Sequence, residues 1–439
     1  MPSLSPLALR RTDAQVDIVA TFRALAARHE HVFWLDAGDA ATEGWSVLGF
    51  GDPDTQGPDA ADPGRVRLDV AAPADCDDEP PFRGGWVGWL DYESGAVRVG
   101  APSAASEGGP AWLRVQQALA VDHGTGAVWV LGAEDALDRM LGSAPLPSST
   151  ASATAPVARQ ASARHEPGEY AALIEQCRDV IRAGTAYQLC LTTRFEVVGA
   201  NDPIETYLRL RAATPAHHGG FVRIGARALL SASPETFLRT AGGRVRTRPI
   251  KGTRPRGIDA ASDAALAAEL RASAKERAEN VMIVDLMRND LSRVCVPGTI
   301  RVDGLWEVES YPAVHQLVST VSGTVVGGLT VQGLWDAAFP AGSMTGAPKL
   351  SAMTVLHRLE GGSPRGVYSG CFGYVGVDGS MDLAMVIRSI LIDGERAVVG
   401  AGGGITWGSE PDAEVAEVAT KARAPLAALG AELPEAWRR

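Results

Sequence analysis

The chain has 439 residues, long enough for one large core or two domains. Its composition, 46% hydrophobic and 21% charged, is typical of a soluble globular protein. Its net charge of −11 argues against a nucleic-acid-binding protein, because phosphate binding requires a concentrated basic surface. No segment approaches the roughly 18 apolar residues of a membrane span, and residues 1–16 lack the apolar core of a secretory signal. We therefore expect a cytoplasmic protein that binds neither nucleic acid nor membranes.

Five cysteines are scattered along the chain, and Cys190, Cys295 and Cys371 have apolar neighbours. Their odd number and wide spacing argue against a disulfide framework, and the absence of a CxxC pair argues against a zinc site. We expect buried, reduced thiols.

The N-terminal part of the chain, residues 1–142, alternates short apolar runs with turn residues, which predicts a β-rich region with strands at 32–35, 85–90 and 127–131. Residues 51–81 are expected to be irregular. Residues 143–167 are rich in Ser, Ala, Thr and Pro, as flexible connectors are. We place a boundary there, before a second region at 168–439.

The second region opens with a predicted helix at about 168–183, because apolar residues recur at helical spacing from Tyr170 to Ile181. Long helices are also expected at 261–294 and 411–428. Glycines separate short apolar runs, which indicates antiparallel hairpins. The predicted strands are 188–195, 221–224, 228–233, 237–240, 244–250, 371–377, 383–392 and 397–400. Strand runs broken by separate helices predict an α+β protein with mostly antiparallel sheets.

The segment Pro249-Ile250-Lys251-Gly252-Thr253 places a lysine at the end of a predicted strand, on a glycine corner. The odd-numbered residues of 244–248 form the less polar face, and continued alternation would point Lys251 into the interior. Desolvation lowers the pKa of a lysine amine, and a neutral amine is a nucleophile. Taken alone, the residue is better explained as an exposed loop lysine.

Two pairs of glutamates, Glu276 with Glu279 and Glu414 with Glu417, are each spaced three apart on a predicted helix. This spacing puts both carboxylates of a pair on one helix face. Either pair alone is best explained as a solvated surface. If the two helices face each other across a cleft, the carboxylates need a cation, and all-oxygen ligands suit Mg²⁺.

Other polar residues fall in apolar or glycine-rich surroundings. The stretches 341–349 and 400–405 could present backbone N–H groups to anions, although neither matches a nucleotide-binding motif. Arg388 interrupts an apolar strand and needs a partner, for which an internal acid and a substrate carboxylate are equally good candidates. Tyr368 could assist it, and His315 is, on its own, an ordinary strand histidine.

Residues from about 165 to 439 resemble the chorismate-binding catalytic region shared by anthranilate, aminodeoxychorismate, isochorismate and salicylate synthases. The matching runs, in chain order, are 233–235, 249–253, 276–294, 315–323, 342–349, 373–388 and 400–422. Residues 33–36 and 84–88 also resemble the N-terminal part of the aminodeoxychorismate synthases. The resemblance implies the chorismate-utilising fold, with its sheets packed as a sandwich, and chorismate as substrate.

Two positions distinguish among these relatives. Lys251 resembles the lysine typical of aminodeoxychorismate synthases, where anthranilate synthases usually have alanine. Gln188 stands where the water-adding relatives carry a lysine base, and a neutral amide cannot take a proton from water at a useful rate. The resemblance thus implies amination of chorismate to 4-amino-4-deoxychorismate. The alternatives are anthranilate synthase component I, which forms anthranilate and pyruvate, and an inactive chorismate-sensing or partner-binding module.

The resemblance also implies roles for individual residues. Lys251 would attack the ring, Glu235 would act as general acid, and His315 joins them as a catalytic residue. Mg²⁺ would be held by Glu276, Glu279, Glu414 and Glu417. The implied substrate-binding residues are Gln188, Thr253, Thr345, Tyr368, Arg388, Gly402, Gly403, Gly404 and Lys421.

The chain departs from the family in residues 406–411, where the usual aspartate is replaced, and at Cys190, where asparagine is common. A glutaminase needs a G-x-C-x-G nucleophile elbow. Cys371 comes closest, but its first glycine is missing and its segment is a predicted strand. We expect ammonia from a separate glutaminase subunit. The sequence leaves open whether the product enters folate biosynthesis, through para-aminobenzoate, or a secondary metabolite, which oligomer forms, and whether tryptophan binds the N-terminal region.

Overall fold

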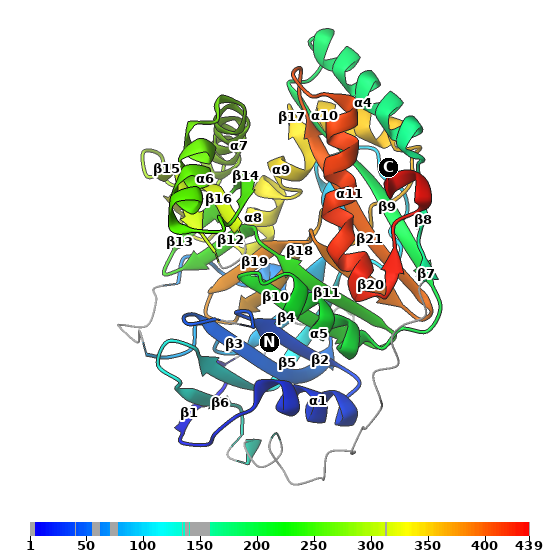
Figure 1. Ribbon diagram of the computed structural model, residues 1–439. Coiled ribbons are helices and arrows are strands. Elements are labelled where there is room, and N and C mark those ends of the chain that lie inside the picture. Colours follow the sequence, from blue (N-terminus) through cyan, green and yellow to red (C-terminus); the bar gives the residue numbers. More distant parts are fainter. Residues whose placement is uncertain are drawn as a thin grey trace.

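The computed structural model describes residues 5–39, 41–54, 62–70, 78–133, 135, 136, 140, 159–311 and 314–438 (Figure 1). Within the described residues, twenty strands form one hydrogen-bonded network, in which the paired strands run antiparallel. A separate two-stranded pairing of β7 (Arg159–Gln160) with β22 (Ala431–Glu432) is parallel. The α+β prediction with mostly antiparallel sheets is therefore confirmed.

The network divides at β5 (Ala111–Asp122) into two arms. One arm continues in spatial order through β3 (Trp45–Pro53), β2 (Val32–Asp36), β10 (His218–Ile224), β11 (Arg227–Ser233), β20 (Ser389–Asp393), β21 (Arg396–Ile405) and β9 (Gln188–Val198). The other continues through β4 (Gly85–Leu90), β18 (Cys371–Gly376), β19 (Met381–Met385), β12 (Thr236–Ala241), β13 (Arg244–Arg248) and β16 (Val314–Thr324). At the far end, β16 is flanked by β14 (Ile250–Pro255) and β15 (Arg301–Ser310).

The two arms pack face to face as a sandwich. Phe33 and Val222 of the first arm share a buried cluster with Val87 and Phe372 of the second. Because side chains alternate along a strand, the neighbouring Trp34 faces the helices on the outside of the first arm instead. Burial of these large apolar surfaces, at about 25 cal/mol per Å², is the main stabilising contribution to the fold.

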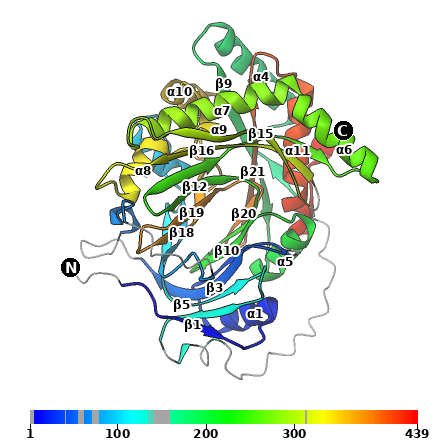
Figure 2. The same ribbon diagram turned by 90° about the vertical axis from the view of Figure 1, so that its left-hand side faces the viewer.

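Helices cover the outer faces of both arms (Figures 1 and 2). The first arm is covered by α1 (Ile18–Arg28), α4 (Pro167–Arg182), α5 (Pro203–Ala213), α10 (Lys349–Leu359) and α11 (Pro411–Ala428). The second is covered by α7 (Ala274–Ser292), α8 (Val331–Ala338) and the short α9 (Gly342–Thr345). In the described part of the chain, no helix combines the length and apolarity needed to cross a membrane.

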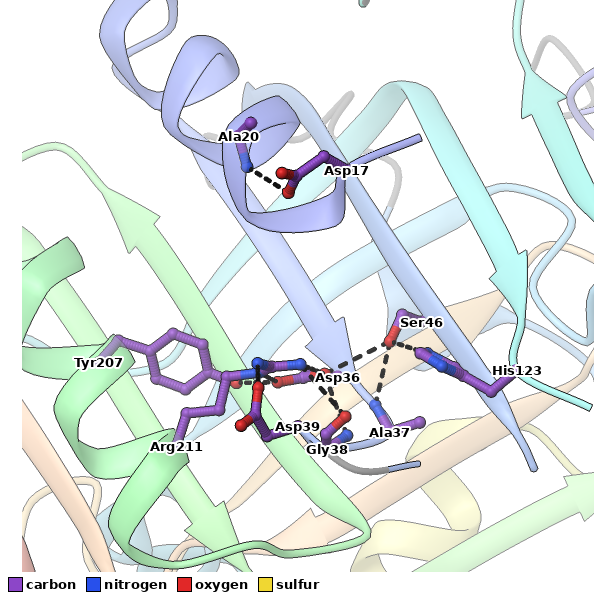
Figure 3. A network of polar contacts seen from close by, with 10 residues as sticks. All are labelled: Asp17, Ala20, Asp36, Ala37, Gly38, Asp39, Ser46, His123, Tyr207 and Arg211. Carbon is purple, nitrogen blue, oxygen red and sulfur yellow. Dashed lines mark hydrogen bonds and ion pairs between the residues drawn. The ribbon is translucent and has the colours of Figure 1, made fainter. Parts of the chain in front are cut away.

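Strands β2, β3, β5 and β4 of the N-terminal region form the middle of the network and pair on both sides with strands of the second region, since β2 pairs with β10 and β4 pairs with β18. Figure 3 shows a polar link between the same regions, in which Asp36 at the end of β2 accepts hydrogen bonds from Tyr207 (2.9 Å) and Arg211 (2.5 Å) of α5. Most of the expected connector lies outside the described residues. The division of the chain at 143–167 stays a prediction.

Three predicted elements are interrupted. The strand at 244–250 breaks at Pro249, so Lys251 lies within β14, and Gly252 (φ 79°) forms a bulge where the register against β16 shifts. The helix at 261–294 is two helices, α6 (Ala260–Ala272) and α7, because the extended Ser273 caps α7. The strand at 383–392 is interrupted before Arg388, which has a φ of 52°.

The cysteine prediction is confirmed for the described residues, because Cys177, Cys190, Cys295 and Cys371 are buried and free. Cys76 lies outside the described residues. Burial raises the pKa of the Cys371 thiol, which lies within β18. A protonated thiol buried in a strand is no nucleophile, as the sequence led us to expect.

Candidate active site

A cavity of about 490 Å³ opens where β14 and β21 face the first turns of α7 and α11. It has walls from both arms of the sandwich. The predicted site residues in its lining are Glu235, Lys251, Thr253, Glu276, Glu279, Tyr368, Arg388, Gly402, Gly403, Gly404, Glu414, Glu417 and Lys421.

The cavity concentrates the lysines of the chain. Of its 41 basic residues only four are lysines, and Lys251, Lys275 and Lys421 line this one cavity. The fourth, Lys349, forms a 2.8 Å ion pair with Asp290. An arginine stays charged in proteins, whereas a lysine amine can be made neutral and reactive. The cavity therefore holds three amines beside the carboxylates of Glu279 and Glu417.

Lys251 is largely buried, and its amine lies 3.7 Å from a carboxylate oxygen of Glu279. Burial lowers the pKa of the amine, but the negative charges of Glu279, Glu235 and Glu417 and the neighbouring Cys190 outweigh it and raise the pKa overall. Desolvation alone therefore does not make the amine neutral in this arrangement. Positive charge brought near these carboxylates would reverse the balance.

Glu235 lies between β11 and β12, with only 8% of its surface exposed. Burial raises the pKa of its carboxyl to about 7, against the opposing effects of the Lys251 charge and a hydrogen bond from Ser343. A group with this pKa can hold or release a proton near neutral pH, which suits a general acid.

The two glutamate pairs line the cavity from the first two turns of α7 and α11, with Glu276 and Glu414 in the first turns, and each pair shares a helix face as its spacing predicted. The positive end of each helix dipole lies there and favours anionic groups. Burial raises the pKa values of Glu279 and Glu414. Arg254 lies 3.6 Å from Glu276, and Lys421 lies 2.6 Å from Glu417.

No three acidic, histidine or cysteine side chains of the described residues converge tightly enough to enclose a metal ion as they stand. Carboxylates from two facing helices across an open cavity nevertheless fit Mg²⁺, which retains several waters and uses few protein ligands. Gly403 leaves the space beside Glu414 free, since a Cβ there would lie 2.9 Å from its carboxylate oxygen.

The guanidinium of Arg388 lines the cavity and has no hydrogen-bond or ion-pair partner within the described parts of the chain. Burial lowers its pKa. An unpaired buried guanidinium favours an anionic ligand over the internal acid that was the alternative explanation. Beside it, the Tyr368 ring lies against Gly400, where a Cβ would be 2.1 Å from the ring.

Three predicted residues are absent from the cavity lining. Gln188 is fully buried behind Gly404, with no described partner for either amide atom. Thr345 donates its hydroxyl to the carbonyl of Ala341 (3.1 Å). His315 bonds to Asp263 (3.0 Å) and Ser310 (2.8 Å) on the other face of β16. Their roles stay predictions.

Sequence reasoning missed several residues of the lining, among them Ser343, Arg254 and Lys275. Ser343 lies in the glycine-rich stretch 341–349, which drew attention for its backbone alone. Its side chain, not its N–H group, is what touches Glu235. Cys190, noted as a buried thiol and as a departure from the family but not as a site residue, also lines the cavity.

Comparison with known proteins identifies the family. The model of the chorismate binding enzymes matches residues 31–427. The chain belongs to the chorismate binding enzyme family. This chorismate binding enzyme is 42% identical, over 79% of its length, to an aminodeoxychorismate synthase of Streptomyces pristinaespiralis. It is 38% identical, over 95% of its length, to that of Streptomyces griseus, and 38% identical, over 80%, to anthranilate synthase component 1 of Streptomyces coelicolor.

The chain spans 51% and 63% of the lengths of the two aminodeoxychorismate synthases, and 73% of the anthranilate synthase component. Among solved structures, anthranilate synthase component I of Streptococcus pneumoniae superimposes with a TM-score of 0.75 at 27% identity, covering 88% of this chain and 92% of that one. The sandwich fold predicted from the family resemblance is confirmed.

Proposed function

We propose that this chorismate binding enzyme aminates chorismate to 4-amino-4-deoxychorismate. The observation that carries the proposal is the Lys251 amine, which lines the cavity beside Glu235 and the glutamate pairs. The two aminodeoxychorismate synthases support it, with identities of 42% and 38%. Anthranilate synthesis is the alternative, and its relatives have the same fold.

Substrate binding in this proposal uses opposite ends of the cavity. The unpaired Arg388, assisted by Tyr368, takes the enolpyruvyl carboxylate through two parallel hydrogen bonds. Thr253 and the backbone at 402–404 hold the ring carboxylate on the side of the glutamates. Lys421 already donates to the Gly402 carbonyl (2.8 Å), so its amine braces this wall.

Glu276, Glu279, Glu414 and Glu417 would hold Mg²⁺ through carboxylate oxygens and water. When bound, the ion supplies positive charge that anchors the ring carboxylate and offsets the carboxylates around Lys251. Positive charge at these carboxylates would weaken the Lys251–Glu279 pair and would favour the neutral form of the amine.

The covalent step begins with the neutral Lys251 amine. Its nitrogen bonds to ring carbon C2, both ring double bonds shift by one position toward C4 (to C1=C6 and C4=C5), and the C4–oxygen bond breaks. Glu235 protonates the departing hydroxyl, which leaves as water, and the Lys251 nitrogen loses a proton. Ammonia then bonds to C4 and loses a proton, both double bonds shift back (to C5=C6 and C1=C2), and the Lys251 nitrogen leaves C2 and regains a proton. The enolpyruvyl group stays on the product, and one hard displacement becomes two easier ones.

The proposed ammonia source is a glutaminase on a separate subunit, and free ammonium should replace it in vitro. Its support is chemical: the described cysteines are buried in their protonated form or lie inside this cavity. We further propose a cytoplasmic location, where such thiols stay reduced.

Product identification tests the proposal. The protein is incubated with chorismate, Mg²⁺ and ammonium, and the products are separated and identified by mass spectrometry. We expect 4-amino-4-deoxychorismate, without release of pyruvate. Anthranilate and pyruvate in equal amounts would establish the alternative, and unchanged chorismate at high ammonium would favour a binding module.

A further inference from the structure

A buried arginine lies directly behind the active site but does not touch its cavity. Arg365 is in the connection between α10 and β18, and only 2% of its side chain is exposed. It is absent from the lining of the 490 Å³ cavity. Its guanidinium lies 4.5 Å from the centre of the Tyr92 ring.

The guanidinium of Arg365 uses its whole set of N–H donors. Nε and Nη2 donate to the two carboxylate oxygens of Glu360 at 2.9 and 2.7 Å. Nη2 also donates to the Cys190 carbonyl at 2.9 Å, and Nη1 donates to the Met344 carbonyl at 2.7 Å and reaches the Ser369 hydroxyl at 3.5 Å. Five contacts match the five N–H groups of a planar fork, an arrangement that a lysine cannot reproduce.

These acceptors belong to three separate walls of the cavity. Cys190 of β9 and Met344 of α9 line it themselves, and Ser369 follows the lining residue Tyr368. Ser369 is fully buried with a φ of 66°, a conformation that persists only where neighbours hold it. One guanidinium thus joins β9, α9 and the Tyr368 segment.

Glu360 extends the connection along β9. The same oxygen that accepts from Arg365 also accepts from the Thr192 N–H (3.0 Å) and hydroxyl (2.9 Å). Thr192 is opposite Gly402 in the β9–β21 pairing, and Cys190 is opposite Gly404. The position of residues 402–404, the glycines of β21 that line the cavity, therefore depends on the Glu360 carboxylate.

The α9 contact leads to the general acid. Ser343, the neighbour of Met344, hydrogen-bonds to the Glu235 side chain and lowers its pKa. A displaced α9 would lose that bond.

We infer that Arg365 is a positioning residue for the reaction, which holds the β9, α9 and Tyr368 walls at the separation that the reacting groups require. The inference deepens the proposed function, on which it rests. A misplacement of reacting groups by about 1 Å can reduce a rate on the order of 10²-fold. Replacement of Arg365 should therefore reduce the turnover rate by more than it reduces the amount of folded protein.

The test compares Arg365→Lys with Arg211→Lys in the full chain. Arg211 is a matched control, because it pairs with Asp36 (Figure 3), is only 10% exposed, lies 4.9 Å from the centre of the Trp34 ring and is absent from the cavity lining. The measurements are the melting temperature, kcat and KM from the disappearance of chorismate with excess Mg²⁺ and ammonium, and the pH dependence of the rate.

For Arg365→Lys we expect kcat to fall on the order of 10²-fold, with a smaller change in the KM for chorismate. The pH at which the rate changes as Glu235 titrates should rise, because loss of the Ser343 contact raises the pKa of Glu235. Arg211→Lys should lower the melting temperature while leaving kcat and this pH dependence unchanged.

A folded Arg365→Lys variant with the wild-type kcat and pH dependence would overturn the inference. If that variant does not fold, Ser369→Ala carries the test, since it removes one contact of the guanidinium and keeps the fold. Wild-type kcat and pH dependence in Ser369→Ala would then overturn it. The assay follows the loss of chorismate, which does not depend on which product forms. If the wild-type protein makes anthranilate, only the proposed function is wrong, and the role of Arg365 can still be tested. If the wild-type protein leaves chorismate unchanged, both the proposed function and the role of Arg365 are wrong.

Discussion

The Lys251 amine lies 3.7 Å from a carboxylate oxygen of Glu279, so the nucleophile and a metal ligand of the proposed reaction form an ion pair. Lys275 approaches the other oxygen of the same carboxylate at 4.0 Å. Occupation of the glutamates by a cation must therefore compete with lysine. This competition couples metal binding to the charge on Lys251.

Replacement of Lys251 tests the covalent route. We expect Lys251→Ala to reduce formation of 4-amino-4-deoxychorismate on the order of 10²-fold or more, because the attacking amine is lost. Lys251→Arg restores the charge beside Glu279 but not a nucleophile, since a guanidinium keeps its proton. Initial rates with excess ammonium should be low for both. Wild-type activity in Lys251→Arg would exclude attack by this residue.

The pH dependence follows from the proton count of Lys251 and Glu235. The pKa of Glu235 is about 7 and that of Lys251 is raised, so above pH 7 the pair holds one proton. The reactive arrangement, a neutral amine with a protonated acid, also holds one. As the pH falls through about 7, a second proton binds and the rate of the covalent step should decrease.

This decrease is measured as the rate of adduct formation without ammonium, which avoids titration of the second nucleophile. Glu235→Gln should remove the change of rate near pH 7. It should also reduce the rate roughly 10²-fold to 10⁴-fold, the usual effect of one general acid. A rate that falls instead as the pH rises through 7 would contradict the shared-proton account.

Removal of one carboxylate should weaken metal binding without any need for turnover. We expect Glu279→Gln to lower Mg²⁺ affinity by more than about tenfold in calorimetric titrations, since even partners of metal ligands contribute this much. Asp412→Asn is the control, because Asp412 lies exposed on the first turn of α11 but outside the cavity lining. Equal affinities in both variants would exclude Glu279 as a ligand.

Arg388 should act mainly on substrate binding. Its replacement by lysine loses the bidentate geometry, and one charge-assisted hydrogen bond contributes about 1.5–3 kcal/mol. We expect Arg388→Lys to raise the KM for chorismate roughly tenfold to 100-fold. Arg246→Lys, at an exposed position of β13, should leave KM unchanged. An unchanged KM in Arg388→Lys would show that the enolpyruvyl carboxylate binds elsewhere.

Local patterns predicted much of the fold and the placing of the glutamates. Helical spacing put Glu276 with Glu279, and Glu414 with Glu417, on single helix faces, and the structure brings both faces into one cavity. Lys251 is largely buried, the outcome expected from alternation along β13, although the strand breaks at Pro249 and Lys251 belongs to β14. These features depend on residues close together in the chain, where periodicity decides.

Features that depend on distant residues could not be predicted in this way. The net charge on Lys251 is set by Glu279, Glu235 and Glu417, which come from three separate segments. The break before Arg388 places a non-glycine residue at positive φ, which its apolar neighbours concealed. Arg365 carried no motif at all, because its importance lies in contacts with β9 and α9.

The central claim, a transient bond between Lys251 and the ring, is tested most directly by the mass of the intact protein after reaction with chorismate and Mg²⁺ in the absence of ammonium. We predict a gain equal to chorismate less one water, which peptide mapping assigns to Lys251 among the four lysines and which ammonium discharges. A wild-type protein that consumes chorismate with ammonium but shows no such adduct under acid quench, or carries it on another residue, would contradict the account.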